Sequence, residues 1–348
     1  MSSPASRLMG MSLPNNWKVV DKMVLTGSMT GSTFSYGYVV ENQNGSIGFL
    51  KALDYSRALT SSDPPAFLKA MTEAFLFERQ LLEKCRTYKM NRIVAAVDSG
   101  SITVDSSRQD GVVSYLIFER ADGDINKQLD LMGKVDEAWL LRVMHHITTA
   151  LNQLHTHNIA HQDVKPSNIL VFKNEGSKLA DLGCASDKNT PFLFDSFEIP
   201  GDREYAPPEL LYQFVLPDWG MRRFSCDMYL LGSMLVFLFS RTNMTALLLS
   251  QLNDIHKPGS WSGGFEGVLV YLRTAFGAAI EIFGRDIPNN IKESIVETVK
   301  ELCDPDPRQR GITKYKGYIS QYSLNQYVSK FNLLASEAEL LVARGLLK

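Results

Sequence analysis

Apolar side chains at helical spacing predict several helices along this chain. The first begins after Asp63-Pro64-Pro65, where Asp63 can cap a helix and proline suits its first turn, and it continues to about Cys85. An amphipathic pattern predicts a long helix over Asp136–His157, and a mostly apolar run predicts a buried helix over Ser225–Arg241. A further helix is predicted over Ile291–Leu302.

The residues before about 121 are typical of β-strands, although strict apolar and polar alternation is weak. Tyr38-Val39-Val40 and Ile47–Leu50 flank Asn44-Gly45, a dipeptide that favours a tight hairpin in which both central residues have positive φ. The β-branched and aromatic run Val112–Phe118 predicts another strand. A mostly β first part and a mostly α second part indicate an α+β protein.

A change of character near Ala121-Asp122-Gly123 suggests where the two parts meet. We expect a flexible tail over residues 1–16, which are rich in Ser, Pro and Met, and a first lobe over residues 17–121. A second lobe over residues 122–311 and a helical C-terminal extension over residues 312–348 complete the predicted organisation.

Composition narrows the class of protein. The chain has 348 residues and 45% of them are hydrophobic, enough for two lobes with a real core. A net charge of -2 gives no field that would steer nucleic acid, so we expect no nucleic-acid partner. The longest apolar run, Met228–Phe239, is too short for a membrane span. The N-terminus lacks the apolar core of a signal peptide, and the cysteines lack zinc-ligand spacing, so a cytoplasmic protein is expected.

The stretch His161–Asn168, H-Q-D-V-K-P-S-N, concentrates side chains that suit phosphoryl transfer. The carboxylate of Asp163 can accept a hydroxyl proton or hold the hydroxyl in line, and the amide oxygen of Asn168 suits Mg²⁺. Asp181-Leu182-Gly183 follows and offers a second oxygen ligand for the metal through Asp181. Phosphoryl transfer needs these groups together with a cation for the phosphates.

These motifs, in this order, resemble those of the eukaryotic-type serine/threonine protein kinase family over roughly residues 20 to 311. The resemblance implies a bilobal fold, with a small antiparallel-β N-lobe that has one main helix and a larger α-helical C-lobe. It implies ATP and Mg²⁺ as cofactors and a protein substrate with a Ser or Thr acceptor. Asp163 and Lys165 would be catalytic, and Asn168 and Asp181 would bind the metal.

The resemblance also assigns the nucleotide-binding residues. Lys51, at the end of Gly48–Lys51, would bind the α- and β-phosphates and pair with a glutamate of the following helix. Glu78 fits this partner best and Glu73 is the alternative. The other implied contacts to the nucleotide are Val39, Glu119, Ala121 and Leu170, with Phe118 as the gatekeeper beside the adenine.

Two acidic residues have implied structural roles. Glu209 ends Gly201–Glu209, which reads G-D-R-E-Y-A-P-P-E, and would pair with Arg310 or, failing that, Arg308. Asp227 matches the aspartate that holds the backbone of the catalytic loop.

The chain departs from the family pattern at its glycine-rich loop. Gly27, Gly31 and Gly37 are more widely spread than G-x-G-x-x-G allows, and we place the phosphate-covering loop at Gly31–Gly37. Phe49 replaces a small alanine and would crowd the nucleotide pocket.

Two further departures affect the catalytic loop. Gln162 replaces the arginine that pairs with a phosphorylated activation segment, and a neutral amide cannot form that charge-assisted pair. We hypothesise that activity does not require phosphorylation there. Asp202 replaces the usual threonine, and we expect it to pair with Lys165 and to belong to the catalytic set.

Two alternatives to an active protein kinase stay open. A catalytically inactive kinase-like scaffold would explain the altered glycine-rich loop, Phe49 and Gln162. A small-molecule phosphotransferase would share Asp163, Asn168 and the metal aspartate, but Lys165 and the activation segment favour protein substrates.

Overall fold

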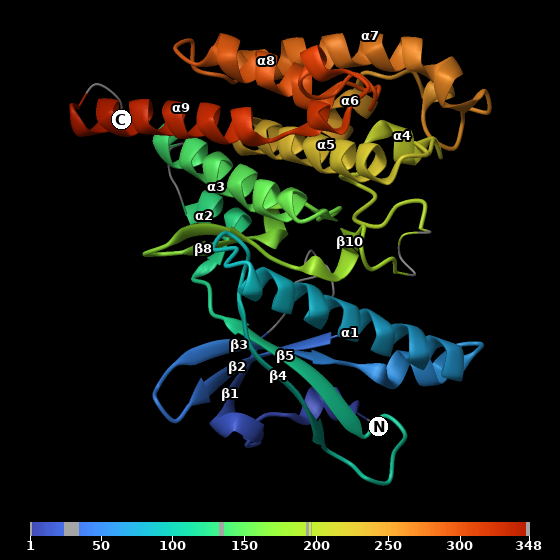
Figure 1. Cartoon of the computed structure of the whole chain (residues 1–348), viewed down its shortest axis with the longest axis vertical. Helices are drawn as coiled ribbons and strands as arrows, with labels where there is room; N and C mark the ends of the chain where they lie inside the picture. The colour runs from blue at the N-terminus through green and yellow to red at the C-terminus, as the bar shows by residue number, and fades with distance from the viewer. Residues whose placement is uncertain (1, 24–34, 132–135, 193–194, 196, 346–348) are drawn as a thin grey trace. The chain divides into compact units, whose positions relative to one another are not determined.

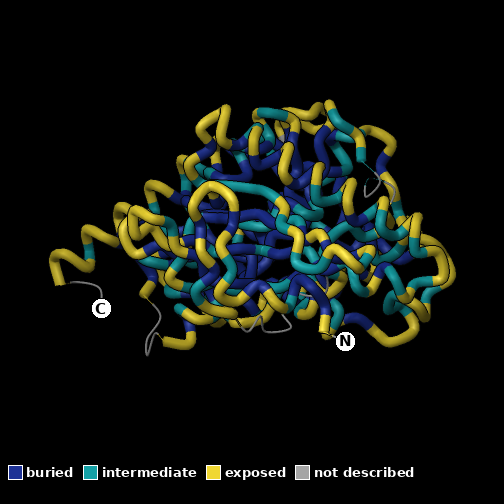
Figure 2. Tube along the Cα trace, turned by 90° about the horizontal axis from the view of Figure 1, so that it is seen from below, coloured by how far each residue is buried: buried dark blue, intermediate teal, exposed yellow. Residues whose placement is uncertain are grey.

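The structure is a computed structural model that describes residues 2–23, 35–131, 136–192, 195 and 197–345 (Figure 1). The chain divides into two compact units, and each is described by itself. The first unit comprises Met1–Asp124 and Leu170–Gly183, and the second comprises Ile125–Ile169 and Cys184–Lys348. This division differs from the predicted lobe bounds, because Leu170–Gly183 joins the first unit. Buried residues line the interior, and exposed residues gather on loops and outer helix turns (Figure 2).

The first unit is built on an antiparallel sheet of five strands in the order β1-β2-β3-β5-β4, which confirms the predicted α+β class. Alternate positions of β3 face the core, because successive side chains of a strand point to opposite faces. Gly48, Leu50 and Ala52 are buried, whereas Phe49 and Lys51 share the opposite face. The strands are β1 (Trp17–Met23), β2 (Ser35–Asn42), β3 (Ile47–Leu53), β4 (Ala96–Thr103) and β5 (Val112–Glu119).

The predicted hairpin joins β2 to β3, with Tyr38 opposite Leu50. Its turn differs from the predicted one, because Gly45 has a φ of 77° but Asn44 does not have a positive φ. The side chain of Asn42 accepts hydrogen bonds from the backbone N–H groups of Asn44 and Ser46, both at 2.9 Å. These local bonds fix a turn with a single left-handed residue, where the sequence suggested two.

The main helix of the first unit is α1 (Pro64–Thr87), and it begins where the sequence predicted. The carboxylate of Asp63 accepts a hydrogen bond from the N–H of Ala66 at 3.2 Å and caps the helix. Its buried face carries Met71, Phe77, Glu78, Leu81, Leu82 and Cys85. Glu78 is therefore a charged group on an otherwise apolar face, a position that needs a partner. Between β3 and this helix lies the short helix η3 (Tyr55–Thr60).

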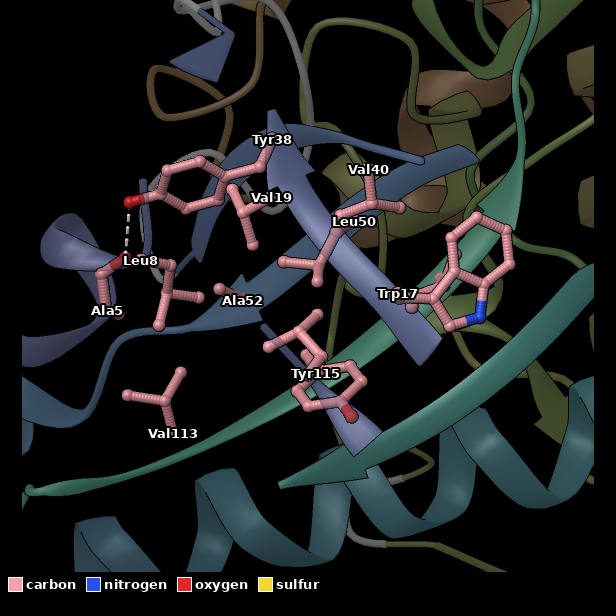
Figure 3. Close-up of a cluster of buried hydrophobic side chains, with 12 residues drawn as sticks. Ala5, Leu8, Trp17, Val19, Tyr38, Val40, Leu50, Ala52, Val113 and Tyr115 are labelled. Atoms are coloured by element: carbon pink, nitrogen blue, oxygen red, sulfur yellow. Dashed lines mark hydrogen bonds between the residues drawn. The ribbon is translucent and has the colours of Figure 1, made fainter. Parts of the chain in front are cut away.

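Residues 2–16 differ from the expected flexible tail. They form the short helices η1 (Pro4–Arg7) and η2 (Pro14–Asn16) and pack on the sheet with Ala5, Leu8 and Leu13 buried (Figure 3). The hydroxyl of Tyr38 donates a hydrogen bond to the backbone oxygen of Ala5 at 2.7 Å. The apolar face of the sheet needs a cover, and this segment supplies it.

We expect Tyr38→Phe to lower the free energy of unfolding by about 1–3 kcal/mol, because it leaves the buried oxygen of Ala5 without its hydrogen bond. Urea denaturation followed by fluorescence measures the change. Tyr36→Phe on the same strand, at a half-buried position, is the control and should cost less. Equal losses in the two variants would mean that the bond to Ala5 does not hold the segment.

The second unit is mostly helical, as predicted. Helix α3 starts after Asp136, whose side chain accepts from the N–H of Trp139 at 3.0 Å. Helix α5 starts before the predicted Ser225, because Asp218 caps it through the N–H of Met221 at 2.8 Å. The helices are α2 (Ile125–Leu131), α3 (Glu137–Thr156), α4 (Pro208–Leu211), α5 (Trp219–Ser240), α6 (Met244–Ser250), α7 (Gly264–Arg285), α8 (Lys292–Cys303) and α9 (Asn325–Ala343).

The C-terminal extension lies along α3 through α9, as Figure 1 shows. The guanidinium of Arg142 on α3 forms a fork with the carboxylate of Glu339, with both N–O distances at 2.8 Å. The hydroxyl of Tyr327 donates to Glu301 on α8 at 3.1 Å. The extension is thus part of the packing of the second unit.

Two small sheets lie next to the candidate site in sequence. In the second unit, β7 (Ile159–Ala160) pairs with β10 (Ser186–Asp187). A separate three-stranded sheet has the order β6-β8-β9, with β6 (Gly123–Asp124), β8 (Ile169–Phe172) and β9 (Gly176–Leu179). Asp124 lies opposite Leu170 in this sheet, which is why Leu170–Gly183 belongs with the first unit.

Among the described residues, α5 and α7 are long and apolar enough to cross a membrane by length and composition alone. The most apolar window is 83% buried in α5 and 50% buried in α7. Burial of this kind is typical of the core helices of soluble proteins, so both helices are weak evidence for a membrane span. The absence of a span stays a prediction.

Candidate active site

The first unit holds Lys51 between two carboxylates. Its Nζ lies 3.1 and 3.2 Å from the carboxylate oxygens of Glu78 and 3.4 Å from Oδ1 of Asp181. Lys51 lies opposite Gly37 in the sheet, Glu78 comes from the buried face of α1, and Asp181 follows β9. Glu73, the alternative partner, is exposed and lies 3.8 Å from Lys69 instead.

The two carboxylates fix the charge of this lysine. Burial alone would lower the pKa of Lys51, but the negative charges of Asp181 and Glu78 outweigh it and raise the pKa above its usual value. Lys51 is therefore an ammonium held in a fixed position. A lysine that is held in position and stays protonated is suited to bind the oxygens of a phosphate.

The other predicted nucleotide contacts are spread over the strands. Gly37 lies inside β2, so the predicted loop Gly31–Gly37 is wrong at its C-terminal end, and Gly31 lies outside the described residues. Val39 is buried in β2, and Leu170 is half-buried in β8. Phe49 lies on the face of β3 that carries Lys51, and its ring centroid is 6.4 Å from that of Phe118.

Glu119 and Ala121 are the predicted hinge residues. The carboxylate of Glu119 is already engaged, since it accepts from the N–H of Ala95 at 2.8 Å and lies 2.8 Å from Nζ of Lys178. A contact of Glu119 to a nucleotide would therefore use its backbone. Ala121 follows β5 without a regular element and is half-buried.

In the second unit, the carboxylate of Asp163 is 2% exposed and is held at both oxygens. Its Oδ2 accepts from Nδ2 of Asn168 at 2.9 Å, and its Oδ1 accepts from the backbone N–H of Asp202 at 2.9 Å. Because the Asn168 amide turns its nitrogen to Asp163, its oxygen points away from that carboxylate. Two residues predicted to act together in the catalytic loop are thus neighbours.

The predicted pairing of Lys165 with Asp202 is present. Nζ of Lys165 lies 2.9 Å from Oδ2 of Asp202 and 3.5 Å from Oδ2 of Asp163, and the lysine is 3% exposed. Burial opposes the charge of Lys165, but Asp163 and Asp202 raise its pKa. The ammonium separates two carboxylates that would otherwise repel each other.

Asp227, on the buried helix α5, holds the catalytic loop by its backbone. Its carboxylate accepts from the N–H groups of His161 and Gln162, both at 2.7 Å, and lies 2.9 Å from Nε2 of His155. Burial would raise the pKa of Asp227, but these partners hold it below its usual value. Gln162 has a φ of 66°, a conformation that these bonds maintain.

Glu209 and Arg310 form the buried ion pair that the sequence predicted as its first choice. The guanidinium binds both carboxylate oxygens at 2.6 Å, and Arg310 is 0% exposed. Arg308, the alternative, pairs with Asp306 at 2.7 Å and with Glu266 at 2.8 Å. The pair ties the start of α4 to the turn that follows α8.

Sequence reasoning missed Arg223 and Asp195, which contact the catalytic loop through Gln162. Nη1 of Arg223 donates to Oε1 of Gln162 at 3.2 Å, and Nη2 lies 3.3 Å from Oδ1 of Asp195. Nothing in the apolar pattern marks either residue, since both are polar and distant in sequence from Gln162.

Comparison with known proteins identifies the family of the chain. A family model described as the protein kinase domain matches residues 34–316. Cyclin-dependent kinase 1 of Encephalitozoon cuniculi is 37% identical over 101 residues, which cover 28% of this chain and 34% of that protein. Cyclin-dependent kinase 4 homolog of Caenorhabditis elegans is 32% identical over 145 residues, 41% of this chain and 34% of that protein.

A longer match is weaker. Extracellular signal-regulated kinase 7 of Drosophila melanogaster is 25% identical over 253 residues, which cover 65% of this chain and 25% of that protein. The chain therefore matches about a third or less of the length of these relatives. The family model, in contrast, spans most of the chain, including Lys51, Asp163, Asp181 and Arg310. The chain belongs to the protein kinase domain family.

Proposed function

We propose that this chain is an active serine/threonine protein kinase that transfers the γ-phosphoryl group of ATP, bound with Mg²⁺, to a hydroxyl of a protein substrate. The observation that carries the proposal is the arrangement around Asp163. Its carboxylate is held by Asn168 and by the backbone of Asp202, with the ammonium of Lys165 3.5 Å away. Positioning and electrostatic stabilisation of this kind are the main contributions that a protein makes to phosphoryl transfer.

The residues fit the two cofactors that the family implies. Each unit offers an oxygen ligand of the kind that Mg²⁺ prefers, the carboxylate of Asp181 in the first unit and the amide oxygen of Asn168 in the second. The ammonium of Lys51, kept charged by Glu78 and Asp181, fits the oxygens of a phosphate. When bound, the metal would neutralise charge on the phosphates.

The side chains of the catalytic loop divide the remaining work. The carboxylate of Asp163 orients the acceptor hydroxyl and takes its proton. Lys165 offers positive charge to the phosphoryl oxygens, and Asp202 holds that lysine in place through the 2.9 Å contact. The positive charge of Lys165 also offsets the repulsion between the carboxylates of Asp163 and Asp202.

Asp202→Ala should lower kcat by about 100-fold, because misplacing a catalytic group by roughly 1 Å costs about that factor. The fold should be retained, since the side chain of Asp202 is 30% exposed and lies at the surface of the site. Steady-state kinetics and circular dichroism measure the two quantities. The matched control is Glu204→Ala, an exposed carboxylate two positions away. Wild-type turnover in Asp202→Ala would rule out this role.

The proposal is tested with the purified chain, Mg²⁺, labelled ATP and a generic basic protein as acceptor. We expect label on the acceptor from the wild type, no label when EDTA removes the metal, and strongly reduced label from Asp163→Asn and Asp181→Asn. Asp254→Asn, an exposed carboxylate in a surface ion pair, is the control and should behave like the wild type. Equal label from Asp163→Asn and the wild type would contradict the catalytic role of Asp163.

A catalytically inactive scaffold is the second candidate, and Phe49 is the observation that favours it. The aromatic ring lies on the same face of β3 as Lys51 and near Phe118, at a position where the family pattern has a small alanine. Calorimetric titration with ATP and Mg²⁺ separates the candidates. A scaffold would bind no nucleotide or bind it without transfer, and Phe49→Ala would then improve binding. A cytoplasmic location without nucleic-acid partners, proposed from composition, goes with either candidate.

A further inference from the structure

The side chain of Gln162 forms its hydrogen bonds within the second unit. In the family pattern an arginine at this position pairs with a phosphorylated activation segment. Its Nε2 donates to the backbone oxygen of Arg223 at 2.9 Å and to Oδ1 of Asp227 at 3.1 Å. Its Oε1 accepts from Nη1 of Arg223 at 3.2 Å. Both ends of the amide are used, and they tie the catalytic loop to the first turns of α5.

Arg223 extends this connection to the stretch between Ser186 and Asp202. Its Nη2 donates to the backbone oxygen of Asp195 at 2.7 Å and lies 3.3 Å from the carboxylate oxygen Oδ1 of the same residue. The side chain of Arg223 is 3% exposed, and that of Asp195 is 19% exposed. This is an ion pair largely removed from water, so its interaction is screened far less than that of a surface pair.

Asp195 has further partners that fix its position. Its Oδ1 accepts from the hydroxyl of Ser186, and its Oδ2 accepts from the backbone N–H of Phe192 at 2.9 Å. The indole N–H of Trp219 donates to the oxygen of Ser186 at 2.9 Å. The carboxylate thus joins β10, Phe192 and the start of α5.

The guanidinium of Arg223 needs this anion. Burial, with a smaller contribution from the neighbouring Arg222, lowers the pKa of Arg223, and Asp195 counteracts that effect. Burying a cation without a partner is strongly unfavourable, so the charge of Asp195 stabilises the burial of Arg223. The same carboxylate is held among hydrogen-bond donors much as a phosphate would be.

The stretch that Asp195 fixes also lies directly against the catalytic loop. A Cβ added at Gly201 would lie 2.3 Å from the backbone oxygen of Gln162 and 2.9 Å from Oδ1 of Asp163. Only glycine allows this approach, and the next residue supplies the N–H that binds Asp163. Displacement of this stretch would therefore displace Asp202 and its contacts to Lys165 and Asp163.

We infer that Asp195 and Arg223 are positioning residues, which hold the described residues between Ser186 and Asp202 against the catalytic loop through Gln162 without a phosphate group. Asp195 supplies the negative charge that a phosphate would otherwise bring. Its cationic partner, Arg223, lies on helix α5 and not in the catalytic loop. The inference rests on the proposed kinase function and adds a way in which the same site is controlled. The ion pair would keep the catalytic loop in position although Gln162 stands where the family pattern has an arginine.

The first test uses the full chain treated with a general protein phosphatase, with mass spectrometry to verify that no phosphate remains. The wild type should keep its kcat after this treatment. Asp195→Asn removes the charge at constant size and should lower kcat by about 100-fold, the cost expected for a displacement of roughly 1 Å at the reacting groups. The KM for ATP should change less than about threefold, because Lys51 and Glu78 are untouched. Asp195→Glu should restore part of kcat.

Matched controls separate a positioning role from a general loss of structure. Asp254→Asn removes an exposed carboxylate of the second unit and should leave kcat unchanged. Arg223→Met should lower kcat as much as Asp195→Asn, and the double variant should lose no more than the worse single variant. Loss of wild-type activity on dephosphorylation, or full activity of Asp195→Asn, would overturn the inference.

A second readout does not depend on catalysis. Amide hydrogen exchange of peptides that contain Phe192 should be at least tenfold faster in Asp195→Ala than in the wild type, because the N–H of Phe192 donates to that carboxylate. Peptides from α8 should exchange at the same rate in both proteins. Unchanged exchange at Phe192 would contradict the inference even in an inactive protein. An inactive wild type with the expected exchange would instead count against the proposed function alone.

Discussion

Asp163→Asn is expected to lower kcat by about 100- to 10,000-fold, the range typical of removing a general base. Asparagine retains an oxygen that can accept from the N–H of Asp202, but it cannot take a proton or balance the charge of Lys165. The affinity for ATP should stay within about threefold of the wild type, because Lys51, Glu78 and Asp181 are unchanged. Single-turnover kinetics with labelled ATP measures the chemical step, and calorimetric titration measures ATP binding.

Asp254→Asn provides the matched control for this variant, since it removes an exposed carboxylate by the same chemical change. Its kcat should equal that of the wild type. A similar loss in both variants would indicate damage from the substitution as such. A kcat of Asp163→Asn within a factor of three of the wild type would exclude Asp163 as the proton acceptor.

Arg310→Met is expected to lower the free energy of unfolding by about 3–5 kcal/mol, the usual cost of removing one partner of a buried ion pair. The substitution leaves the carboxylate of Glu209 buried and uncompensated, with Glu209 only 4% exposed. Methionine preserves much of the volume and can still contact Tyr229, whose ring lies 4.8 Å from the guanidinium carbon. Chemical denaturation of the purified variant measures the loss.

Two further variants isolate the contribution of the pair. Lys257→Met breaks an ion pair in which Asp254 is 90% exposed, and it should cost less than about 1 kcal/mol. In Glu209→Gln combined with Arg310→Met, the loss should be clearly smaller than the sum of the single losses, because no uncompensated charge remains. Additive losses would show that the two residues act independently.

Much of the fold could be predicted because its strands and helices carry strong local signals. Asp63 and Asp136 cap the helices that the apolar pattern predicts, and the strands on either side of Asn44-Gly45 pair as a hairpin, although its turn differs from the predicted one. The limits of α5 were less accurate. The apolar run starts at Ser225, but Asp218 satisfies the backbone of an earlier turn.

The N-terminal segment was wrongly predicted because its apolar residues are few and lack a regular period. Ala5, Leu8 and Leu13 lie among Ser, Pro and Met residues that favour a tail. Their burial depends on a complementary apolar face of the sheet, formed by strands distant in sequence. Such a long-range match cannot be read from a local window.

The candidate site shows the same division. Motif spacing led to the pairs Lys51–Glu78, Lys165–Asp202 and Glu209–Arg310, because the family pattern carries long-range information that a single sequence lacks. Spacing also placed Gln162 where the family pattern has an arginine, and a neutral amide cannot form that arginine's charge-assisted pair. It did not reveal Asp195 and Arg223, whose contact with Gln162 arises only when separate stretches fold together.

The most direct test of the proposed kinase activity is identification of the amino acid that receives the phosphate. Wild-type chain, Asp163→Asn and Asp254→Asn are each incubated with Mg²⁺, γ-labelled ATP and a basic acceptor protein, and the acceptor is then hydrolysed in acid. The proposal predicts labelled phosphoserine or phosphothreonine from the wild type and Asp254→Asn, with label from Asp163→Asn reduced at least about 100-fold. Label confined to phosphotyrosine, or no transfer by a chain that binds ATP, would contradict it.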